Sequence, residues 1–302
     1  MGAGGVWWGL GRYAGRVLTL REVHKSYGST VAVDGLSLRI EAGEVFGLLG
    51  PNGAGKSTTI GLAVGLLRPD RGEVELAGLG SPTRASVRRH LGACPQQIAL
   101  YEQFSGEENL LFLGKLHGLD RATRKRRAAE LLERVGLTAR AKDRVSAYSG
   151  GMQRRLNIAA ALVHDPKLVL LDEPTAGVDP HSRHALFELV RALKSEGRTV
   201  VYTTHYMEEA QRLCDRVGVI DQGRVLALGT VDELIAAHGG QSVVTVLRDG
   251  ASGEDKAERI ETDDPMRVIA RVAGEPGARE VRLERPDLEG VFLHLTGRSL
   301  RD

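Results

Sequence analysis

Polar and apolar residues alternate along two stretches near the start of the chain, Arg16 to Val23 and Thr30 to Ile40. A period of two predicts strands that bury one face and expose the other, so we expect an antiparallel region here. The next stretch, Val45 to Leu49, is apolar throughout and predicts a strand that is buried on both faces.

Two later apolar runs, Lys167 to Leu171 and Arg198 to Thr203, are bounded by Pro, Gly or Asp, which is typical of buried parallel strands. The residues between them, Asp179 to Glu196, predict a helix, and the three segments together predict a βαβ unit. Upstream, Ala99 to Val163 has helical periodicity, many charges and few β-branched residues. We therefore expect a mainly helical region over about residues 98–165.

The pattern changes again after Gly240. Alternation over Gln241 to Arg248 and Glu280 to Glu284 predicts strands, and Pro265 to Val272 predicts a helix. One further helix has an apolar face made by four residues: Leu288, Val291, Phe292 and Leu295. We expect a main domain over residues 17–239, a small α+β accessory domain over residues 240–302, and a poorly ordered extension over residues 1–16.

Composition narrows the class of protein. At 302 residues, the chain can form one large and one small domain. Its 41 Lys and Arg residues nearly balance 39 Asp and Glu residues, so no nucleic-acid partner is expected. The basic run Arg121 to Arg127 is followed by Glu130 and Glu133, which favours a solvated helix face over a nucleic-acid patch.

The two cysteines, Cys94 and Cys214, are too few for a disulfide framework and are expected to be small buried side chains.

No apolar run approaches the roughly 20 residues that a membrane-spanning helix needs. The first sixteen residues lack the long apolar segment of a signal peptide. Any membrane role is therefore expected to depend on a partner.

A phosphate-binding loop lies directly after the strand predicted over Val45 to Leu49. The pattern G-x-x-x-x-G-K-[ST] is matched at every fixed position, and the predicted contacts are Gly50, Pro51, Asn52, Gly53, Ala54, Gly55, Lys56, Ser57 and Thr58. Glycines let backbone N–H groups turn toward phosphate oxygens at the start of a helix. We expect Lys56 to reach the β- and γ-phosphates and Ser57 to ligate Mg²⁺. An ordinary glycine-rich turn is the weaker alternative, so the chain is predicted to bind a nucleoside triphosphate.

Two carboxylates, Asp172 and Glu173, directly follow the buried strand predicted over Lys167 to Leu171. Beside a phosphate loop, Asp172 is expected to hold Mg²⁺ through water and Glu173 to activate or orient the attacking water. Ser149, Gly150 and Gly151 begin another helix whose N–H groups are open to an anion. Because the chain already has one phosphate site, this second helix end is expected to serve the nucleotide of a neighbouring copy.

Together these motifs resemble those of the nucleotide-binding subunits of ATP-binding cassette (ABC) transporters, in which a Ser-Gly-Gly-Gln segment is characteristic. Here the segment reads Tyr-Ser-Gly-Gly-Met-Gln, and Tyr148 stands where the family usually has Leu. The resemblance implies an α/β P-loop NTPase fold with a RecA-like core, an antiparallel β layer and a helical subdomain. It also implies two copies that enclose two ATP molecules between them.

The resemblance further implies roles for four residues. Gln96 corresponds to a glutamine that touches Mg²⁺ and relays to the permease, and Asp179 to an aspartate that crosses the dimer. His205 corresponds to a switch histidine at the γ-phosphate, and Tyr27 to the aromatic residue that stacks on adenine. The alternatives are that Tyr27 belongs to a strand core and that His181 and His184 form a metal site.

Three segments are similar to exporter ATPases of the daunorubicin-resistance type: Pro174 to Pro180, Thr204 to Ala210, and Leu288 to Arg298. This similarity implies a homodimer at the cytoplasmic face of the membrane that powers a separate permease, most simply for export of a drug-like or lipid-like compound. An importer subunit shares every catalytic residue and stays open. An ABC ATPase that acts on DNA is disfavoured, since only about ninety residues without heptads separate the two phosphate-binding segments. One that acts on ribosomes is disfavoured because such family members usually carry two cassettes in one chain, whereas this chain has one.

Overall fold

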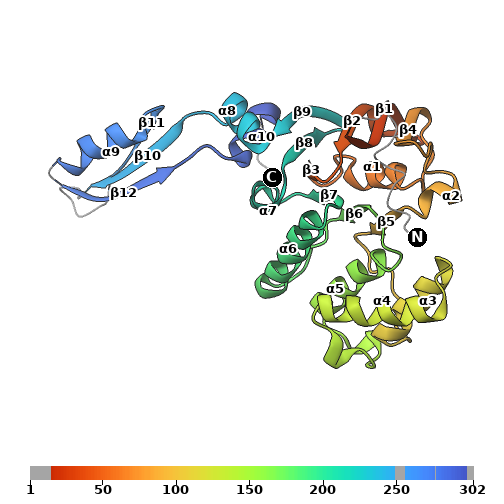
Figure 1. Cartoon of the computed structure of the whole chain (residues 1–302). Helices are drawn as coiled ribbons and strands as arrows, with labels where there is room; N and C mark the ends of the chain where they lie inside the picture. The colour runs from red at the N-terminus through yellow and green to blue at the C-terminus, as the bar shows by residue number, and fades with distance from the viewer. Residues whose placement is uncertain (1–14, 249–255, 276, 298–302) are drawn as a thin grey trace. The chain divides into compact units, whose positions relative to one another are not determined.

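The computed structural model describes residues 15–248, 256–275 and 277–297, and it divides the chain into two compact units that meet in sequence at Gly229 and Thr230 (Figure 1). The second unit thus begins ten residues before the predicted boundary at Gly240. The reason is that helix α8 (Val231–His238) packs against helix α10 (Leu288–Thr296). The extension predicted over residues 1–16 lies outside the described residues except for its last two, and Arg16 already belongs to a strand.

An antiparallel sheet forms the first layer of the first unit, in the order β2-β1-β4. Its strands are β1 (Arg16–Tyr27), β2 (Thr30–Glu41) and β4 (Arg71–Leu76). Leu18 and Leu20 of β1 are buried, and they pair with Ile40 and Leu38 of β2. The alternating pattern of the sequence therefore predicted β1 and β2 correctly, whereas β4 was not predicted.

The second sheet of this unit has six strands in the order β5-β6-β7-β3-β8-β9. They are β5 (Leu91–Cys94), β6 (Leu168–Asp172), β7 (Thr199–Thr204), β3 (Val45–Leu49), β8 (Arg216–Asp221) and β9 (Arg224–Thr230). The first five run parallel to their neighbours in this order. Every residue of β3, β6 and β7 is buried, as the continuous apolar runs predicted. The carboxyl ends of β3, β6 and β7 consequently lie at one edge of the sheet, where the predicted site residues follow.

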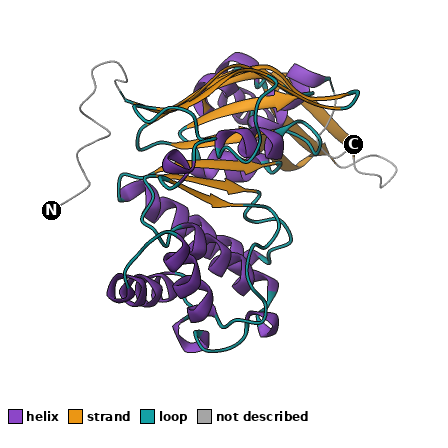
Figure 2. Cartoon of the chain, turned by 90° about the vertical axis from the view of Figure 1, so that its right-hand side faces the viewer, coloured by secondary structure: helices purple, strands orange, loops and turns teal. Residues whose placement is uncertain are grey.

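The helical region forms a group of its own, shown in yellow and green in Figure 1 and in purple below the strands in Figure 2. It contains α3 (Gly106–Leu116), α4 (Arg121–Arg134), α5 (Gly150–Ala161) and the short helices η1 (Thr138–Arg140) and η2 (Val145–Ala147). The α3 helix begins with a capping box, in which Ser105 accepts from the backbone N–H of Glu108 while the Glu108 side chain accepts from that of Ser105. The other helices of the first unit are α1 (Lys56–Ala63), α2 (Ala85–Arg88), α6 (Pro180–Ser195) and α7 (Met207–Leu213).

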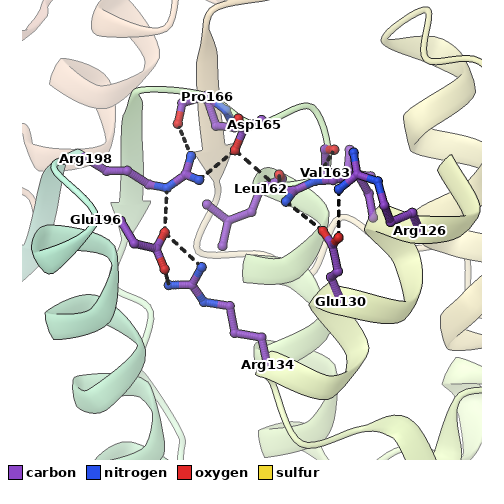
Figure 3. Close-up of polar contacts among 10 residues, drawn as sticks. Arg126, Glu130, Arg134, Leu162, Val163, Asp165, Pro166, Glu196 and Arg198 are labelled. Carbon is purple, nitrogen blue, oxygen red and sulfur yellow. Dashed lines mark hydrogen bonds and ion pairs between the residues drawn. The ribbon is translucent and has the colours of Figure 1, made fainter. Parts of the chain in front are cut away.

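A polar network joins the helical group to the parallel sheet (Figure 3). The Arg198 guanidinium is nearly buried and donates to the Pro166 carbonyl, to Asp165 at 2.6 Å and to Glu196 at 3.1 Å. Arg134 of α4 reaches the same Glu196 carboxylate at 2.7 Å. The network therefore ties α4 to the segments that enter β6 and β7.

Two stacked histidines lie in the same region. The rings of His117 and His164 are parallel, with centroids 3.7 Å apart. A nitrogen of His164 lies 3.0 Å from the Leu91 carbonyl oxygen of β5. Burial of the ring, followed by the nearby His117, lowers the pKa of His164 to about 4.

The second unit has its own antiparallel sheet in the order β11-β10-β12, covered by α9 (Pro265–Ala273). The strands are β10 (Ser242–Arg248), β11 (Lys256–Thr262) and β12 (Ala278–Glu284). Val244 and Val246 of the sheet are fully buried against Val272 of α9. The apolar face of α10 is buried at Leu288, Val291 and Phe292, whereas Leu295 is half-buried.

Candidate functional site: the phosphate loop and the acids beside it

The phosphate loop connects β3 to α1 and needs glycine at two positions. A Cβ atom on Gly50 would lie 2.2 Å from the Ile220 carbonyl oxygen. Gly55 has φ +102°, and a Cβ there would lie 2.4 Å from the Ala32 carbonyl oxygen. The close backbone contacts around the loop thus exclude any side chain at these positions.

Lys56 is the first residue of α1 and its side chain turns back over the loop. Its ammonium group donates to the carbonyl oxygens of Gly50 at 2.7 Å and Pro51 at 2.9 Å. The same nitrogen lies 3.1 Å from Glu173 Oε1, and both side chains are almost completely buried. The two charges therefore balance each other at the carboxyl edge of the sheet.

A cavity of about 530 Å³ opens beside the loop. Nine predicted site residues line it: Tyr27, Asn52, Gly53, Gly55, Lys56, Ser57, Thr58, Gln96 and Glu173. Tyr27 is 50% exposed at the end of β1, so the alternative of a strand-core tyrosine is wrong. Gly50, Pro51 and Ala54 belong to the loop but not to the cavity wall.

The paired acids take different positions. Asp172 ends β6, is buried, and accepts a 2.6 Å hydrogen bond from the Thr203 hydroxyl of β7. The Thr203 hydroxyl oxygen in turn accepts from the backbone N–H of Glu173 at 2.9 Å. Glu173 has φ +44°, a left-handed conformation that is uncommon for a residue with a side chain and that occurs at functional sites.

The Glu173 carboxylate is where the predicted catalytic residues meet. The Gln96 side-chain amide donates to Glu173 Oε2 at 3.2 Å, and His205 Nδ1 lies 3.4 Å from the same oxygen. Gln96 follows β5 and His205 follows β7, so residues far apart in sequence come together at this carboxylate. Such convergence of an amide, an imidazole and an ammonium group suits a carboxylate that handles protons near phosphate.

The groups predicted to hold Mg²⁺ fit that ion in chemistry. Ser57 offers a hydroxyl, Gln96 an amide oxygen and Asp172 a carboxylate, and hard oxygen ligands are those that Mg²⁺ prefers. Ser57 and Gln96 line the same cavity, and Asp172 precedes Glu173, which also lines it.

The second segment that is predicted to bind an anion lies elsewhere. Ser149 caps α5 by accepting from the backbone N–H of Met152, and neither Ser149 nor the following Gly150 and Gly151 lines the phosphate-loop cavity. A Cβ on Gly151 would lie 2.6 Å from Ser182 Oγ and 3.4 Å from Asp179 Oδ2. The start of α5 therefore abuts the start of α6.

Asp179 is exposed and caps α6, where the backbone N–H of Ser182 donates to its carboxylate at 3.0 Å. That bond lowers the pKa of Asp179. Tyr148, the residue that departs from the usual family form, is buried and donates to the Arg140 carbonyl oxygen at 2.7 Å. Tyr148 thus anchors the segment before α5 from a position outside the phosphate-loop cavity.

Sequence reasoning missed several polar residues that support the site, notably Thr203 and Glu209. Both are buried, and the hydroxyl of Thr203 connects the two acids. A threonine at the end of a buried strand was a usable signal for Thr203. Nothing in the sequence distinguishes Glu209 from the adjacent Glu208.

Comparison with known proteins identifies the family. The family model for ABC transporters matches residues 33–176. The linearmycin resistance ATP-binding protein of Bacillus subtilis is 42% identical over 95% of this chain and 100% of its own length. The daunorubicin resistance ATP-binding protein of Streptomyces coeruleorubidus is 42% identical, over 95% of this chain and 98% of its own. A Nod factor export ATP-binding protein of Cupriavidus pinatubonensis is 44% identical, over 95% of this chain and 92% of its own.

Solved structures agree with the predicted fold class. An ATP-binding subunit of an ABC transporter has a TM-score of 0.68 and 32% identity, and covers 74% of this chain and 93% of that one. A dimeric ATP-binding cassette in a post-hydrolysis state, bound to ADP and Pi, has a TM-score of 0.66 and 28% identity over 70% of this chain and 98% of that one. Among the described residues, no helix has the length and apolar character needed to cross a membrane. The chain belongs to the ABC transporter family and is an ATP-binding, ATP-hydrolysing subunit of a transporter.

Proposed function

We propose that two copies of this chain hydrolyse ATP at the cytoplasmic face of a membrane and power a separate permease that exports a drug-like or lipid-like compound. The observation that carries the export role is the extent of the match to relatives named for linearmycin resistance, daunorubicin resistance and Nod factor export. The alignments span 95% of the chain and so extend into the second unit.

The phosphate-loop cavity is proposed to hold ATP. The exposed Tyr27 ring is free to stack on the base, a contact worth about 1–3 kcal/mol that does not itself select adenine. The loop N–H groups and Lys56 bind the phosphates. Ser57, Gln96 and Asp172 hold Mg²⁺, which neutralises phosphate charge when it is bound.

Glu173 is proposed to take the proton of the attacking water or to orient that water. Its neighbours support this role, since Gln96 donates to the carboxylate and His205 lies within 3.4 Å of it. His205 donates toward the γ-phosphate, and Gln96 passes the state of the site to the permease. Lys56, which contacts Glu173 at 3.1 Å, is free to exchange that contact for phosphate oxygens.

The homodimer is proposed because the start of α5 is suited to bind an anion but lies outside the cavity that would hold this chain's own phosphates. Ser149, Gly150 and Gly151 lie outside the phosphate-loop cavity but next to Asp179 of the same chain. In a head-to-tail pair, each composite site joins one copy's loop to the other copy's Ser149, Gly150, Gly151 and Asp179. ATP then closes the pair and its hydrolysis opens it, because ATP binds the closed state more tightly.

To test the direction of transport, the permease is first identified as the membrane protein that copurifies with the chain. The two are then expressed together. Inside-out vesicles should accumulate the exported compound only with ATP, and vesicles with a Glu173→Gln chain should not. Accumulation by right-side-out vesicles supplied with a binding protein would instead make the chain an importer subunit.

A further inference from the structure

One buried carboxylate has no part in the proposed ATPase mechanism. Glu209 of α7 is 2% exposed, and its Oε2 accepts three hydrogen bonds from hydroxyl groups. The donors are Thr175 at 2.9 Å, Tyr202 at 3.0 Å and Thr204 at 2.9 Å. Burying a carboxylate costs free energy unless hydrogen bonds or charges compensate it. A role beyond packing is therefore expected for Glu209.

Two of these donors flank the proposed catalytic groups. Thr175 lies two residues after Glu173, and Thr204 directly precedes His205. The Thr204 hydroxyl oxygen also accepts from the backbone N–H of Tyr206 at 2.9 Å, so the backbone on both sides of His205 is held.

The other carboxylate oxygen faces the start of α6. This stretch follows Asp179, which is proposed to contact the partner copy, and is called the cross-dimer segment below. Arg183 of α6 lies four residues after Asp179, and its Nε is 3.6 Å from Glu209 Oε1. The same guanidinium lies 5.3 Å from the centre of the Tyr206 ring. Glu209 thereby joins the end of β7, the start of α6 and the segment after Glu173.

We propose that Glu209 is a positioning residue that fixes the distance between Glu173 and His205 and couples both to the cross-dimer segment that begins α6. This inference rests on the proposed roles of Glu173 and His205. An ionised carboxylate only accepts hydrogen bonds, so Glu209 Oε2 can hold three hydroxyls. Its Oε1 has no hydrogen-bond partner among the described residues and faces the Arg183 guanidinium as an ion pair. Alanine removes all of these contacts. Glutamine keeps an oxygen for the hydroxyls but turns an N–H₂ group toward Arg183.

The test is steady-state ATP hydrolysis by the purified full-length chain. Glu209→Ala should lower kcat by about tenfold or more, as loss of supporting contacts around an active site does, and Glu209→Gln should recover part of the loss. KM for ATP should change by less than about threefold, because the phosphate loop is not touched. A Thr204→Val change should lower kcat too and add little to the Ala variant, because the two residues share one contact.

Glu44 supplies a matched control. It is another carboxylate of the first unit with little exposure, 8%, and it accepts from the backbone N–H of Glu41 at 2.7 Å and pairs with Arg216 at 3.2 Å. If Glu209→Ala turned over ATP as fast as Glu44→Ala, or if kcat and ATP binding fell together, the positioning role would be wrong. Should Glu209→Ala fail to fold, Glu209→Gln and Thr204→Val are judged by the same comparison.

Failure of this inference is distinguishable from failure of the proposed function. An inactive Glu173→Gln chain that still binds ATP, together with a normal Glu209→Ala chain, would remove only the role of Glu209. An active Glu173→Gln chain would remove the catalytic assignment and, with it, the positioning role.

Discussion

At the scale of single residues, Glu173 contacts three polar side chains from different parts of the chain: Lys56, Gln96 and His205. The phosphate-loop pattern and the paired acids pointed to Lys56 and Glu173 in advance, whereas Gln96 and His205 were predicted only from the resemblance to ABC ATPases. The contacts among them were not predictable in the same way, since the rotamers depend on the surrounding packing. Glu209 was missed entirely for that reason.

Glu173→Gln should leave ATP affinity nearly unchanged and reduce turnover by about two orders of magnitude or more, since an amide cannot accept a proton from water. Fluorescent-nucleotide titration and phosphate release measure the two quantities. The variant should also accumulate as an ATP-bound dimer in size-exclusion chromatography. Phosphate release near the normal rate would remove Glu173 from the chemical step.

His164 should make stability depend on pH. Its pKa is lowered from 6.5 to about 4 by burial first and then by His117, while the Leu91 carbonyl oxygen and Asp165 oppose the shift and Arg127 adds to it. Between these pH values the unfolded chain binds a proton that the folded chain does not. The free energy of unfolding should therefore fall as pH falls from 6.5 toward 4, by up to about 3 kcal/mol from this group, and the effect of the group should level off below pH 4.

Urea unfolding at a series of pH values measures this dependence. His164→Gln should flatten the decline between pH 6.5 and 4. The exposed His184, changed in the same way, is the matched control and should leave the decline as it is. Equal curves for the two variants would contradict the assignment to His164.

At the scale of elements, the fully buried strands β3, β6 and β7 were the easiest to predict, because a short apolar run bounded by turn residues is typical of a strand covered on both faces. The four-residue β5, which contains Gly92, carries too little pattern to be recognised from sequence. Helix α8 did carry a signal, the capping box of Thr230 and Glu233, and it would have placed the unit boundary correctly.

The network around Arg198 should stabilise the junction between α4 and the parallel sheet (Figure 3). Arg198→Met removes the donors to the Pro166 carbonyl and the two carboxylates, and should lower the free energy of unfolding by about 2 kcal/mol. Arg259→Met is the control, because that arginine pairs with Glu284 at an exposed position and should matter by less than about 0.5 kcal/mol. Urea unfolding measures both, and equal losses would contradict a special role for the network.

At the scale of the whole molecule, the resemblance predicted a pair of chains, which a single chain cannot display. The similar tails of related exporter ATPases suggest in addition that the second unit supports dimer or permease assembly. The apolar face of α10 is accounted for by packing on α8 within the second unit. A role for that unit in assembly therefore stays a prediction.

Hydrolysis should require two copies, so specific activity should rise with protein concentration. Mixing a Lys56→Ala chain with a Ser149→Arg chain tests the composite site directly. In the mixed dimer one site carries both changes and the other carries neither, so the mixture should be more active than either variant alone. A mixture no more active than its parts, with activity per chain constant on dilution, would argue for independent monomers.

Truncation after Gly229, where the first unit ends, should preserve ATP binding because no residue of the phosphate-loop cavity is removed. The shortened chain should copurify less with the permease, or should support slower transport. A shortened chain that assembles and transports as well as the full one would leave the second unit without a role in either.

The order of strands in the parallel sheet has a mechanical consequence. The β3 strand leads into the phosphate loop and has a parallel neighbour on each side. The β5 strand leads to Gln96, has only four residues and, among the described strands, pairs with β6 alone. Opening β5 costs fewer hydrogen bonds than opening β3, so its amide protons should exchange with deuterium much sooner. The nucleotide is thus held by a rigid central strand, whereas the residue proposed to report its presence follows a pliable strand at the edge.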